Sequence, residues 1–175
     1  MNRVNIVSKE TISKKNFNRL KQIKVLLTDV DGVLTDGGMY YTEAGLVMKK
    51  FNAKDGMGVK LLRETGIKTG IISADKTPIA KKRADVLKFD FISYGVENKL
   101  DEVKKIISEN GFTPEQIAFI GDDVNDLEVL DFVGLSICPK DAASQVIKKC
   151  HLVTPQKGGE CVFRYISDLI IFTQK

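Results

Sequence analysis

The sequence is poor in histidine, cysteine and tryptophan. Its 175 residues include one histidine, His151, three cysteines and no tryptophan. The cysteines (Cys138, Cys150 and Cys161) are odd in number and form no CxxC pair, which indicates free thiols in a reducing compartment. A single histidine argues against a histidine-rich zinc site. A metal site in this chain would therefore use oxygen ligands, which favours magnesium.

Long apolar stretches are also missing. No segment is long enough to cross a bilayer, and the start, MNRVNIVSKE, lacks the apolar region of a signal peptide. We therefore expect a cytoplasmic location and no membrane partner. The length and the 43% hydrophobic content predict a single domain with a sizeable core. We expect residues 1–20 to form an N-terminal extension or short helix and residues 21–175 to form the domain.

The net charge of +4 comes with an excess of lysine. The densest cluster is DKTPIAKKR, residues 75–83, which contains no aromatic residue of the kind that nucleic-acid recognition would add. The cluster has two interpretations: the solvated face of a helix, or a positive field that attracts an anionic substrate. Nucleic acid is not an expected partner.

Short apolar runs alternate with helical patterns along the chain. The runs that predict buried strands are KVLLTD (24–29), KTGIIS (68–73), FDFISY (89–94), QIAFIG (116–121), GLSICP (134–139) and HLVT (151–154). The helical patterns cover residues 55–66, 77–87, 98–111, 124–133 and 141–149. This alternation predicts an α/β fold with a mostly parallel sheet. The segment GGMYYTEAGLVMKKFN, residues 37–52, breaks the pattern and is expected to be an inserted β-hairpin.

Polar side chains follow four of these strands, where parallel sheets bind their ligands. The set is Asp29, Asp31, Ser73, Lys99, Asp122, Asp123 and Asp126. We expect Asp29, Asp31 and Asp122 to meet at one edge of the sheet, where three acids would repel one another. A Mg²⁺ ion would remove that conflict. Asp123 and Asp126 are expected around the metal, where they would hold waters or the lysine.

Magnesium prefers carboxylates, waters and a phosphate oxygen, so the predicted site indicates phosphoryl transfer. Asp29 can attack phosphorus and form an aspartyl phosphate. Asp31, two residues on, can protonate the leaving oxygen and later activate water. Ser73 can donate a hydrogen bond to a phosphate oxygen, Lys99 supplies positive charge, and Asp122 completes the metal site.

Each of these residues also has a purely structural interpretation. A DxD pair occurs by chance in loops, Ser73 could end a strand or cap a helix, and GDDVND could be a turn followed by a helix N-terminus. Lys99 would ordinarily be solvated, although it lies in the first turn of a predicted helix, where a cation opposes the macrodipole. The ordered set at four successive strand ends favours the functional interpretation.

The motifs DVDGVLTD, Ser73, Lys99 and GDDVND resemble those of the haloacid dehalogenase superfamily of phosphatases, over about residues 23–172. The segments DGVLTDG, FNAKDGMGVKLL, NKL, GDDVND and GGECVFR resemble its capless group of 3-deoxy-D-manno-octulosonate (Kdo) 8-phosphate phosphatases. The resemblance implies a Rossmann-like, doubly wound core and Mg²⁺-dependent hydrolysis of a sugar acid phosphate. It also implies a homotetramer in which the hairpins of residues 37–52 pack centrally and a neighbouring subunit covers each site.

The resemblance further implies a set of substrate contacts. Lysine and arginine would bind the carboxylate and phosphate of such a substrate, and Arg164 would reach a neighbouring site. The implied contacts are Asp31, Asn52, Ala53, Lys54, Asp55, Gly56, Lys60, Asp75, Arg83 and Lys99.

The sequence departs from that group at two points. Ala74-Asp75 stands where the group usually has Gly-Arg, and a similar acid occurs in relatives that act on 2-keto-3-deoxynononate 9-phosphate, which the GGE of the tail also resembles. Cys161 stands where glycine is usual. Kdo 8-phosphate is the expected substrate, with the nine-carbon ester as the alternative. Similar domains also serve as non-catalytic oligomerisation modules, but such a module has no need of the full set of polar residues.

Overall fold

The computed structural model describes residues 12–175 of the chain. Six parallel strands form the central sheet in the order β5-β4-β1-β6-β7-β8, so the expected α/β fold and all six expected strands are confirmed. Their bounds are β1 Val25–Thr28, β4 Lys68–Ser73, β5 Phe91–Tyr94, β6 Ile117–Ile120, β7 Leu135–Cys138 and β8 Leu152–Val153. β1 and β6 are fully buried, as central strands of a sheet covered on both faces should be.

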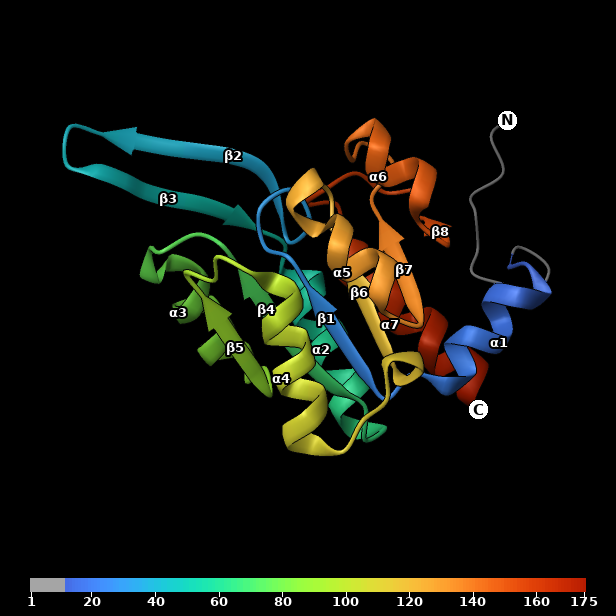
Figure 1. Ribbon diagram of the computed structural model, residues 1–175. Helices are drawn as coiled ribbons and strands as arrows, with labels where there is room; N and C mark the ends of the chain where they lie inside the picture. The colour runs from blue at the N-terminus through green and yellow to red at the C-terminus, as the bar shows by residue number, and fades with distance from the viewer. Residues whose placement is uncertain (1–11) are drawn as a thin grey trace.

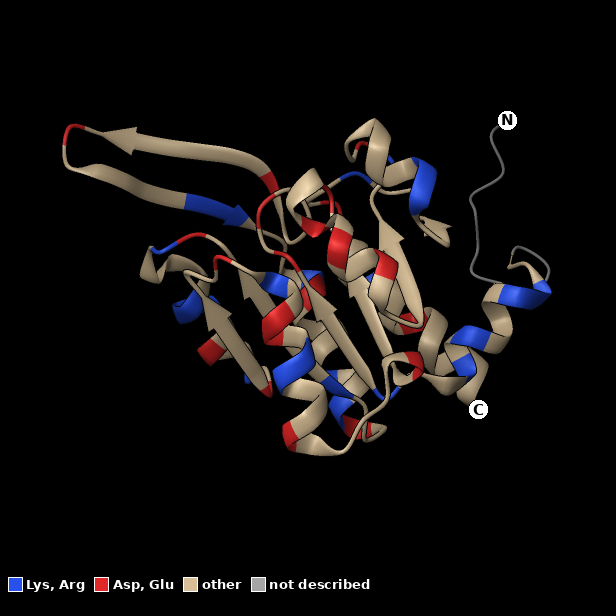
Figure 2. Cartoon of the chain, in the orientation of Figure 1, with Lys and Arg blue, Asp and Glu red and all other residues tan. Residues whose placement is uncertain are grey.

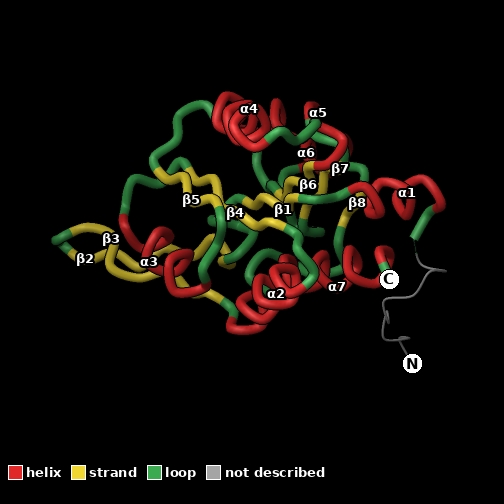
Figure 3. The backbone as a smooth tube through the Cα atoms, turned by 90° about the horizontal axis from the view of Figure 1, so that it is seen from below, coloured by secondary structure: helices red, strands yellow, loops and turns green. Residues whose placement is uncertain are grey.

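Helices cover both faces of this sheet and make the protein three-layered. Figure 3 shows α4, α5 and α6 on one face and α2, α3 and α7 on the other. Each face has its own apolar core, of which Leu26 and Phe119 are central members. The bounds are α2 Ala53–Glu64, α3 Pro78–Leu87, α4 Lys99–Asn110, α5 Leu127–Phe132, α6 Ser144–Lys149 and α7 Val162–Gln174.

The strand order changes direction beside β1. The chain winds through β4 and β5 on one side of β1 and through β6, β7 and β8 on the other. Thr28 pairs with Ile120, and the Asp29 N–H donates to the Ile120 carbonyl at 2.8 Å. The loops that follow β1 and β6 therefore start side by side, at the switch point where open α/β sheets bind ligands.

A two-stranded antiparallel hairpin leaves the body after β1 (Figure 1). Its strands are β2, Thr35–Thr42, and β3, Gly45–Phe51, so it begins two residues before the expected insert. The outer part of the hairpin carries large exposed apolar side chains. These are Met39, Tyr40, Tyr41, Val47 and Met48.

A helix crosses the expected boundary between residues 20 and 21. α1 spans Lys14–Gln22, and the Ser13 side chain caps it by accepting the Asn16 N–H. Leu20 is fully buried, and the Gln174 side chain donates to the carbonyl of Leu20 at 3.0 Å. α1 therefore belongs to the folded domain, and the remainder of the expected extension, residues 1–11, lies outside the described residues.

The C-terminal helix α7 was not expected from the sequence. Its buried side chains, among them Phe163, Ile166 and Leu169, recur at helical spacing along one face, and it packs against α1 and α2. Cys161 precedes it with φ at 70°, a left-handed conformation that glycine adopts more readily. Among residues 12–175, no helix is both long enough and apolar enough to span a membrane.

Candidate active site

A cavity of about 290 Å³ opens at the carboxyl ends of β1 and β6. Figure 2 shows acidic residues gathered at this end of the sheet. The lining residues come from the loop after β1 and the loop after β6, and they are Asp29, Asp31, Gly32, Gly37, Asp122, Asp123, Val124 and Asn125. The predicted acids of both loops thus share one cavity.

Three carboxylates form a cluster beside this cavity. One oxygen from each of Asp29, Asp122 and Asp126 lies within 4.8 Å of the others. Both oxygens of Asp126 already have partners: Oδ1 accepts from Lys99 Nζ at 2.6 Å, and Oδ2 accepts from the Asp122 N–H at 3.0 Å. The Asp29 Oδ1 accepts from the Val30 N–H at 2.6 Å. Asp126 therefore positions its neighbours. Asp29 and Asp122 line the cavity, whereas Asp126 does not, so Asp29 and Asp122 are the cluster members that can bind a ligand.

Lys99 is the cation that contacts the cluster. It is the first residue of α4, where the Asn98 side chain caps the helix. Its Nζ lies 2.8 Å from Asp29 Oδ2 and 2.6 Å from Asp126 Oδ1. Burial would lower the pKa of Lys99, but the charges of Asp29 and Asp126 outweigh that effect and raise it above its usual value. Lys99 is therefore held as a charged group.

One lysine does not neutralise three carboxylates. Burial, together with the charges of Asp29 and Asp126, raises the pKa of Asp122 to about 8. Burial likewise raises the pKa of Asp29 to about 6, although Lys99 opposes this change. A hard divalent cation would supply the missing positive charge, and carboxylate oxygens are the ligands that magnesium prefers. The donor set therefore fits a magnesium ion held by Asp29 and Asp122.

Asp31 was predicted among the metal-binding acids. It lines the same cavity as Asp29 and Asp122, but its carboxylate lies outside the cluster. Its Oδ2 accepts from Lys49 Nζ at 2.6 Å, and its Oδ1 is buried with no hydrogen-bond partner among the described residues. Lys49 comes from β3 and was not predicted as a site residue. Strand alternation gave one usable signal, since the side chains of Lys49 and Lys50 must point to opposite faces.

Ser73 and Asp75 follow the neighbouring strand β4. Ser73 is buried, and its Oγ accepts from the Asp75 N–H at 3.2 Å. The Asp75 carboxylate accepts from Lys49 Nζ at 2.5 Å and from the Thr77 hydroxyl at 2.6 Å. Burial raises the pKa of Asp75, but the hydrogen bonds from Lys49 and Thr77 dominate and lower it. Asp75, which stands where the resemblance leads one to expect arginine, is thus held by Lys49 and Thr77 of its own chain.

The other implied substrate contacts do not line the cavity. Asn52 caps α2 by accepting from the Lys54 N–H, Asp55 is buried and accepts from the Arg164 N–H at 2.9 Å, and Arg83 lies over the Phe51 ring. Lys60 is exposed and lies 3.9 Å from Glu64. The implied contacts that are not in the cavity lining are Asn52, Ala53, Lys54, Asp55, Gly56, Lys60, Asp75, Arg83, Lys99 and Arg164.

Two glycines let the walls of the cavity approach each other. Gly32 has φ of 75°, and a Cβ atom there would lie 2.0 Å from Asp122 Oδ2. Gly158, in the loop before α7, lies so close to the Gly32 carbonyl that a Cβ would come within 2.1 Å of its oxygen. The loop after β1 is therefore packed between Asp122 and the C-terminal segment.

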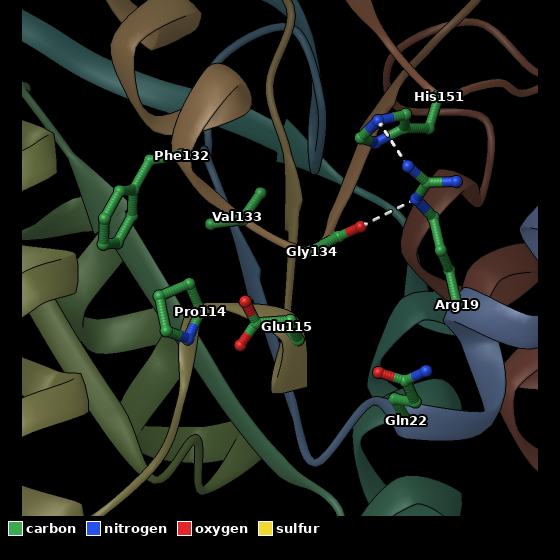
Figure 4. Close-up of a pocket in the computed structure, with 8 residues that line it drawn as sticks. All are labelled: Arg19, Gln22, Pro114, Glu115, Phe132, Val133, Gly134 and His151. Carbon is green, nitrogen blue, oxygen red and sulfur yellow. Dashed lines mark hydrogen bonds between the residues drawn. The ribbon is translucent and has the colours of Figure 1, made fainter.

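A second cavity, of about 310 Å³, lies at the opposite edge of the sheet, before β6 and β7 (Figure 4). Arg19 crosses it, donating to the Gly134 carbonyl at 3.0 Å and lying 3.2 Å from His151 Nε2. Glu115 is the acidic residue in its lining. Its lining has a single carboxylate, whereas the cluster of carboxylates that could hold a divalent cation lies beside the first cavity, so the carboxylate cavity is the candidate active site.

The parallel sheet, the loop of Asp29 and Asp31 and the cluster around Lys99 define a phosphohydrolase of the haloacid dehalogenase type. The family model for haloacid dehalogenase-like hydrolases matches residues 79–166, and the chain belongs to this family.

Within the family, the chain is similar to several Kdo 8-phosphate phosphatases. The chain is 36% identical over 158 residues to 3-deoxy-D-manno-octulosonate 8-phosphate phosphatase KdsC of Yersinia pestis, covering 90% of this chain and 84% of that protein. A Yersinia pestis crystal structure of that phosphatase gives a TM-score of 0.90 at 34% identity, covering 93% and 88% of the two chains. The Moraxella catarrhalis enzyme, solved with magnesium, phosphate and KDO, gives 0.87 at 30% identity, covering 90% and 91%.

Proposed function

We propose that this protein is a Mg²⁺-dependent phosphatase that hydrolyses Kdo 8-phosphate. The observation that carries the proposal is the group of Asp29, Asp122, Asp126 and Lys99 at the carboxyl ends of β1 and β6. Similarity over nearly the whole chain to phosphatases of this substrate supports the choice of ester. Magnesium, when bound by Asp29 and Asp122, would neutralise their charge and that of the phosphate.

In the first step, Asp29 acts as the nucleophile. A carboxylate oxygen of Asp29 attacks phosphorus, the bond from phosphorus to the sugar oxygen breaks, and its electron pair goes to that oxygen. Asp31 donates a proton to the departing oxygen, which leaves as an alcohol. Lys99, held by Asp126, provides positive charge beside Asp29. The Ser73 hydroxyl would donate a hydrogen bond to a phosphate oxygen.

In the second step, water removes the phosphoryl group from Asp29. Asp31 accepts a proton from the attacking water, the new bond to phosphorus forms, and the bond to the Asp29 oxygen breaks. Inorganic phosphate is released, and Asp29 returns to its carboxylate form. Asp31 ends this step protonated, as it was at the start, so one residue serves both steps.

Assembly as a homotetramer is part of the proposal. The exposed apolar side chains of the hairpin, such as Tyr41 and Met48, are unusual for a projecting arm in water and suit packing against other copies. The residues outside the cavity, including Lys60, Arg83 and Arg164, would then contact the substrate at a site shared between subunits. We further propose a cytoplasmic location for this enzyme.

One observation favours a second substrate. Asp75 places an acid beside the site where Kdo 8-phosphate phosphatases usually have arginine, and 2-keto-3-deoxynononate 9-phosphate is therefore the alternative ester. The pairing of Asp75 with Lys49 reduces the charge that it would present to either substrate.

The first experiment measures phosphate release from both esters, with Mg²⁺ and with EDTA. We expect release from Kdo 8-phosphate that EDTA abolishes, and an Asp29→Asn protein slower by about a thousandfold or more, because it lacks the nucleophile. Faster release from 2-keto-3-deoxynononate 9-phosphate would make that ester, and not Kdo 8-phosphate, the assigned substrate. Release from neither ester by the unaltered protein would remove the assignment and favour a non-catalytic oligomerisation module.

A further inference from the structure

Lys49 is a buried lysine at the root of the hairpin. Its side chain is 0% exposed, and its Nζ lies 2.6 Å from Asp31 Oδ2 and 2.5 Å from Asp75 Oδ2. The next residue, Lys50, has a side chain that is 69% exposed and pairs with Asp36 at 3.0 Å. The Lys49–Lys50 pair forms the blue stretch near the end of β3 in Figure 2. Two adjacent lysines of one strand thus have opposite environments.

A hairpin anchor alone does not explain a buried lysine. Removing an ammonium group from water costs several kcal/mol, and an apolar side chain would secure the hairpin without that cost. Two carboxylates compensate the charge of Lys49, and one of them belongs to Asp31, which has a chemical role in the proposed reaction. The contact therefore joins the hairpin to the reacting group and not merely to the body of the protein.

Lys49 occupies only one oxygen of Asp31. Oδ2 accepts the hydrogen bond from Lys49, whereas Oδ1 is buried and has no partner among residues 12–175. A buried oxygen without a donor is unfavourable unless a proton or a substrate group satisfies it. Oδ1 is thus the oxygen that can carry the proton transferred in the reaction.

We propose that Lys49 is a positioning residue for proton transfer. It fixes Asp31 through Oδ2 and leaves Oδ1 for the proton, and Asp75 holds Lys49 in place from the opposite side. The inference rests on the proposed function, because it assigns Lys49 to the steps in which Asp31 gives and accepts a proton.

The test compares two esters whose leaving groups differ in their need for a proton. The sugar oxygen of Kdo 8-phosphate leaves as an alcohol and needs the proton, whereas p-nitrophenyl phosphate releases a stable phenolate without one. In Lys49→Met we expect kcat for Kdo 8-phosphate to fall by about a hundredfold, the low end of what proton transfer contributes, with KM within about threefold. The initial burst of p-nitrophenolate, followed by stopped flow, should keep its rate within about fivefold, because forming the aspartyl phosphate from this ester needs no acid.

Three further variants make the comparison specific. Lys50→Met makes the same chemical change on the exposed face of β3 and should leave both reactions unchanged. Lys49→Arg keeps the charge and should recover at least about tenfold of the loss. Asp75→Asn should show the selective loss in weaker form, about tenfold on Kdo 8-phosphate, because Lys49 then has one charged partner.

A Lys49→Met protein that slows both esters equally, or neither, would overturn the inference while leaving the proposed function in place. If circular dichroism shows that Lys49→Met does not fold, Asp75→Asn decides, and an unchanged ratio between the esters would overturn the inference. If the unaltered protein hydrolyses glycerol 3-phosphate but not Kdo 8-phosphate, only the sugar-acid assignment fails, and glycerol 3-phosphate replaces it in the comparison. Absence of Mg²⁺-dependent release from every ester would overturn both.

Discussion

At the scale of single residues, Gly32 meets two demands at once. Its positive φ disfavours any side chain, and its Cα lies where a Cβ would collide with the Asp122 carboxylate. Gly66 meets only the first demand, since its φ is 80° but a Cβ atom there would have no described atom within 4 Å. The two glycines therefore separate backbone strain from damage to the proposed metal site.

We expect Gly32→Ala to weaken Mg²⁺ binding as well as stability. Both Gly32→Ala and Gly66→Ala should lower the free energy of unfolding by about 1–2 kcal/mol through backbone strain. Only Gly32→Ala should displace Asp122 and raise the Mg²⁺ concentration for half-maximal phosphate release, by about tenfold or more. Titrations of activity with Mg²⁺, paired with urea unfolding, check this. Equal Mg²⁺ requirements in the two variants would contradict it.

Asp55 offers a test of pH dependence that does not involve the metal site. Burial raises the pKa of Asp55 to about 6 from an ordinary 3.8, so the folded state holds this proton more tightly than the unfolded chain. The resulting stabilisation is fully present below about pH 4 and is lost as the pH rises through about 6. Two pKa units correspond to about 3 kcal/mol at most.

Asp55→Asn should therefore be more stable than the unaltered protein at pH 7.5 and about equally stable at pH 4. Asparagine has no charge to bury, and its carbonyl oxygen can still accept from the Arg164 N–H. Urea unfolding of both proteins at several pH values gives the difference curve, in which other titrating groups cancel. A difference that stays constant from pH 4 to 7.5 would show that burial of Asp55 does not set the trend.

At the scale of secondary structure elements, α7 contributes to the site indirectly, through its packing against α2. It packs along α2, and α2 follows the hairpin directly. Leu169 of α7 is fully buried, whereas Phe172, three residues further, is 38% exposed. The helix therefore offers a buried and an exposed apolar residue one turn apart.

We expect Leu169→Ala to lower the free energy of unfolding by about 2–5 kcal/mol, because it leaves a cavity in the core. Phe172→Ala, a larger truncation at an exposed position, should cost clearly less. Chemical unfolding followed by circular dichroism measures both values. A larger loss for Phe172→Ala would mean that the helix packs with a different face.

The sequence predicted best those elements whose own residue pattern shows how they are buried. Apolar runs such as residues 116–121 predict central strands, because burial on both faces demands apolar side chains throughout. α7 was missed although its buried residues recur at the three- and four-residue spacing of one helix face, so its pattern was a usable signal. α1 was assigned to an extension because the contacts that bury Leu20 come from distant segments.

The positions of the site residues in the fold were predictable from the sequence, but the directions of all their side chains were not. The order of polar residues after successive strands located Asp29, Lys99 and Asp122 at one edge, because the topology of parallel sheets brings strand ends together. The direction of the Asp31 side chain was not predictable, since it depends on Lys49. That lysine reaches the site because β3 runs antiparallel to β2 and returns to the loop after β1, a contact that residues close in sequence do not specify.

At the scale of the whole molecule, the hairpin is distinguished by several large exposed apolar side chains on one projecting arm. Tyr41 is 66% exposed and Met48 54%, and they belong to the same projecting arm. Val86 on α3 is 73% exposed and lies on the body of the protein. These residues allow a matched comparison of surfaces.

A double variant with Tyr41→Asp and Met48→Asp should dissociate the proposed homotetramer. Charges placed in an apolar interface lose their hydration without gaining partners. Light scattering should show the mass falling towards that of a single 19.5 kDa chain. Val86→Asp should leave the mass unchanged. An unaltered protein that is already monomeric, or a double variant that keeps its mass, would contradict the proposed assembly.

The contact between Gly158 and the loop after β1 also bears on when the enzyme can become active during its synthesis. Asp29 and Asp31 leave the ribosome well before Gly158, which packs against their loop. Helix α7, which packs against α2, emerges later still. In a nascent chain whose Gly158 segment is still in the exit tunnel, the proposed catalytic acids lie in an unfinished pocket, and we expect hydrolysis only after that segment has emerged and folded.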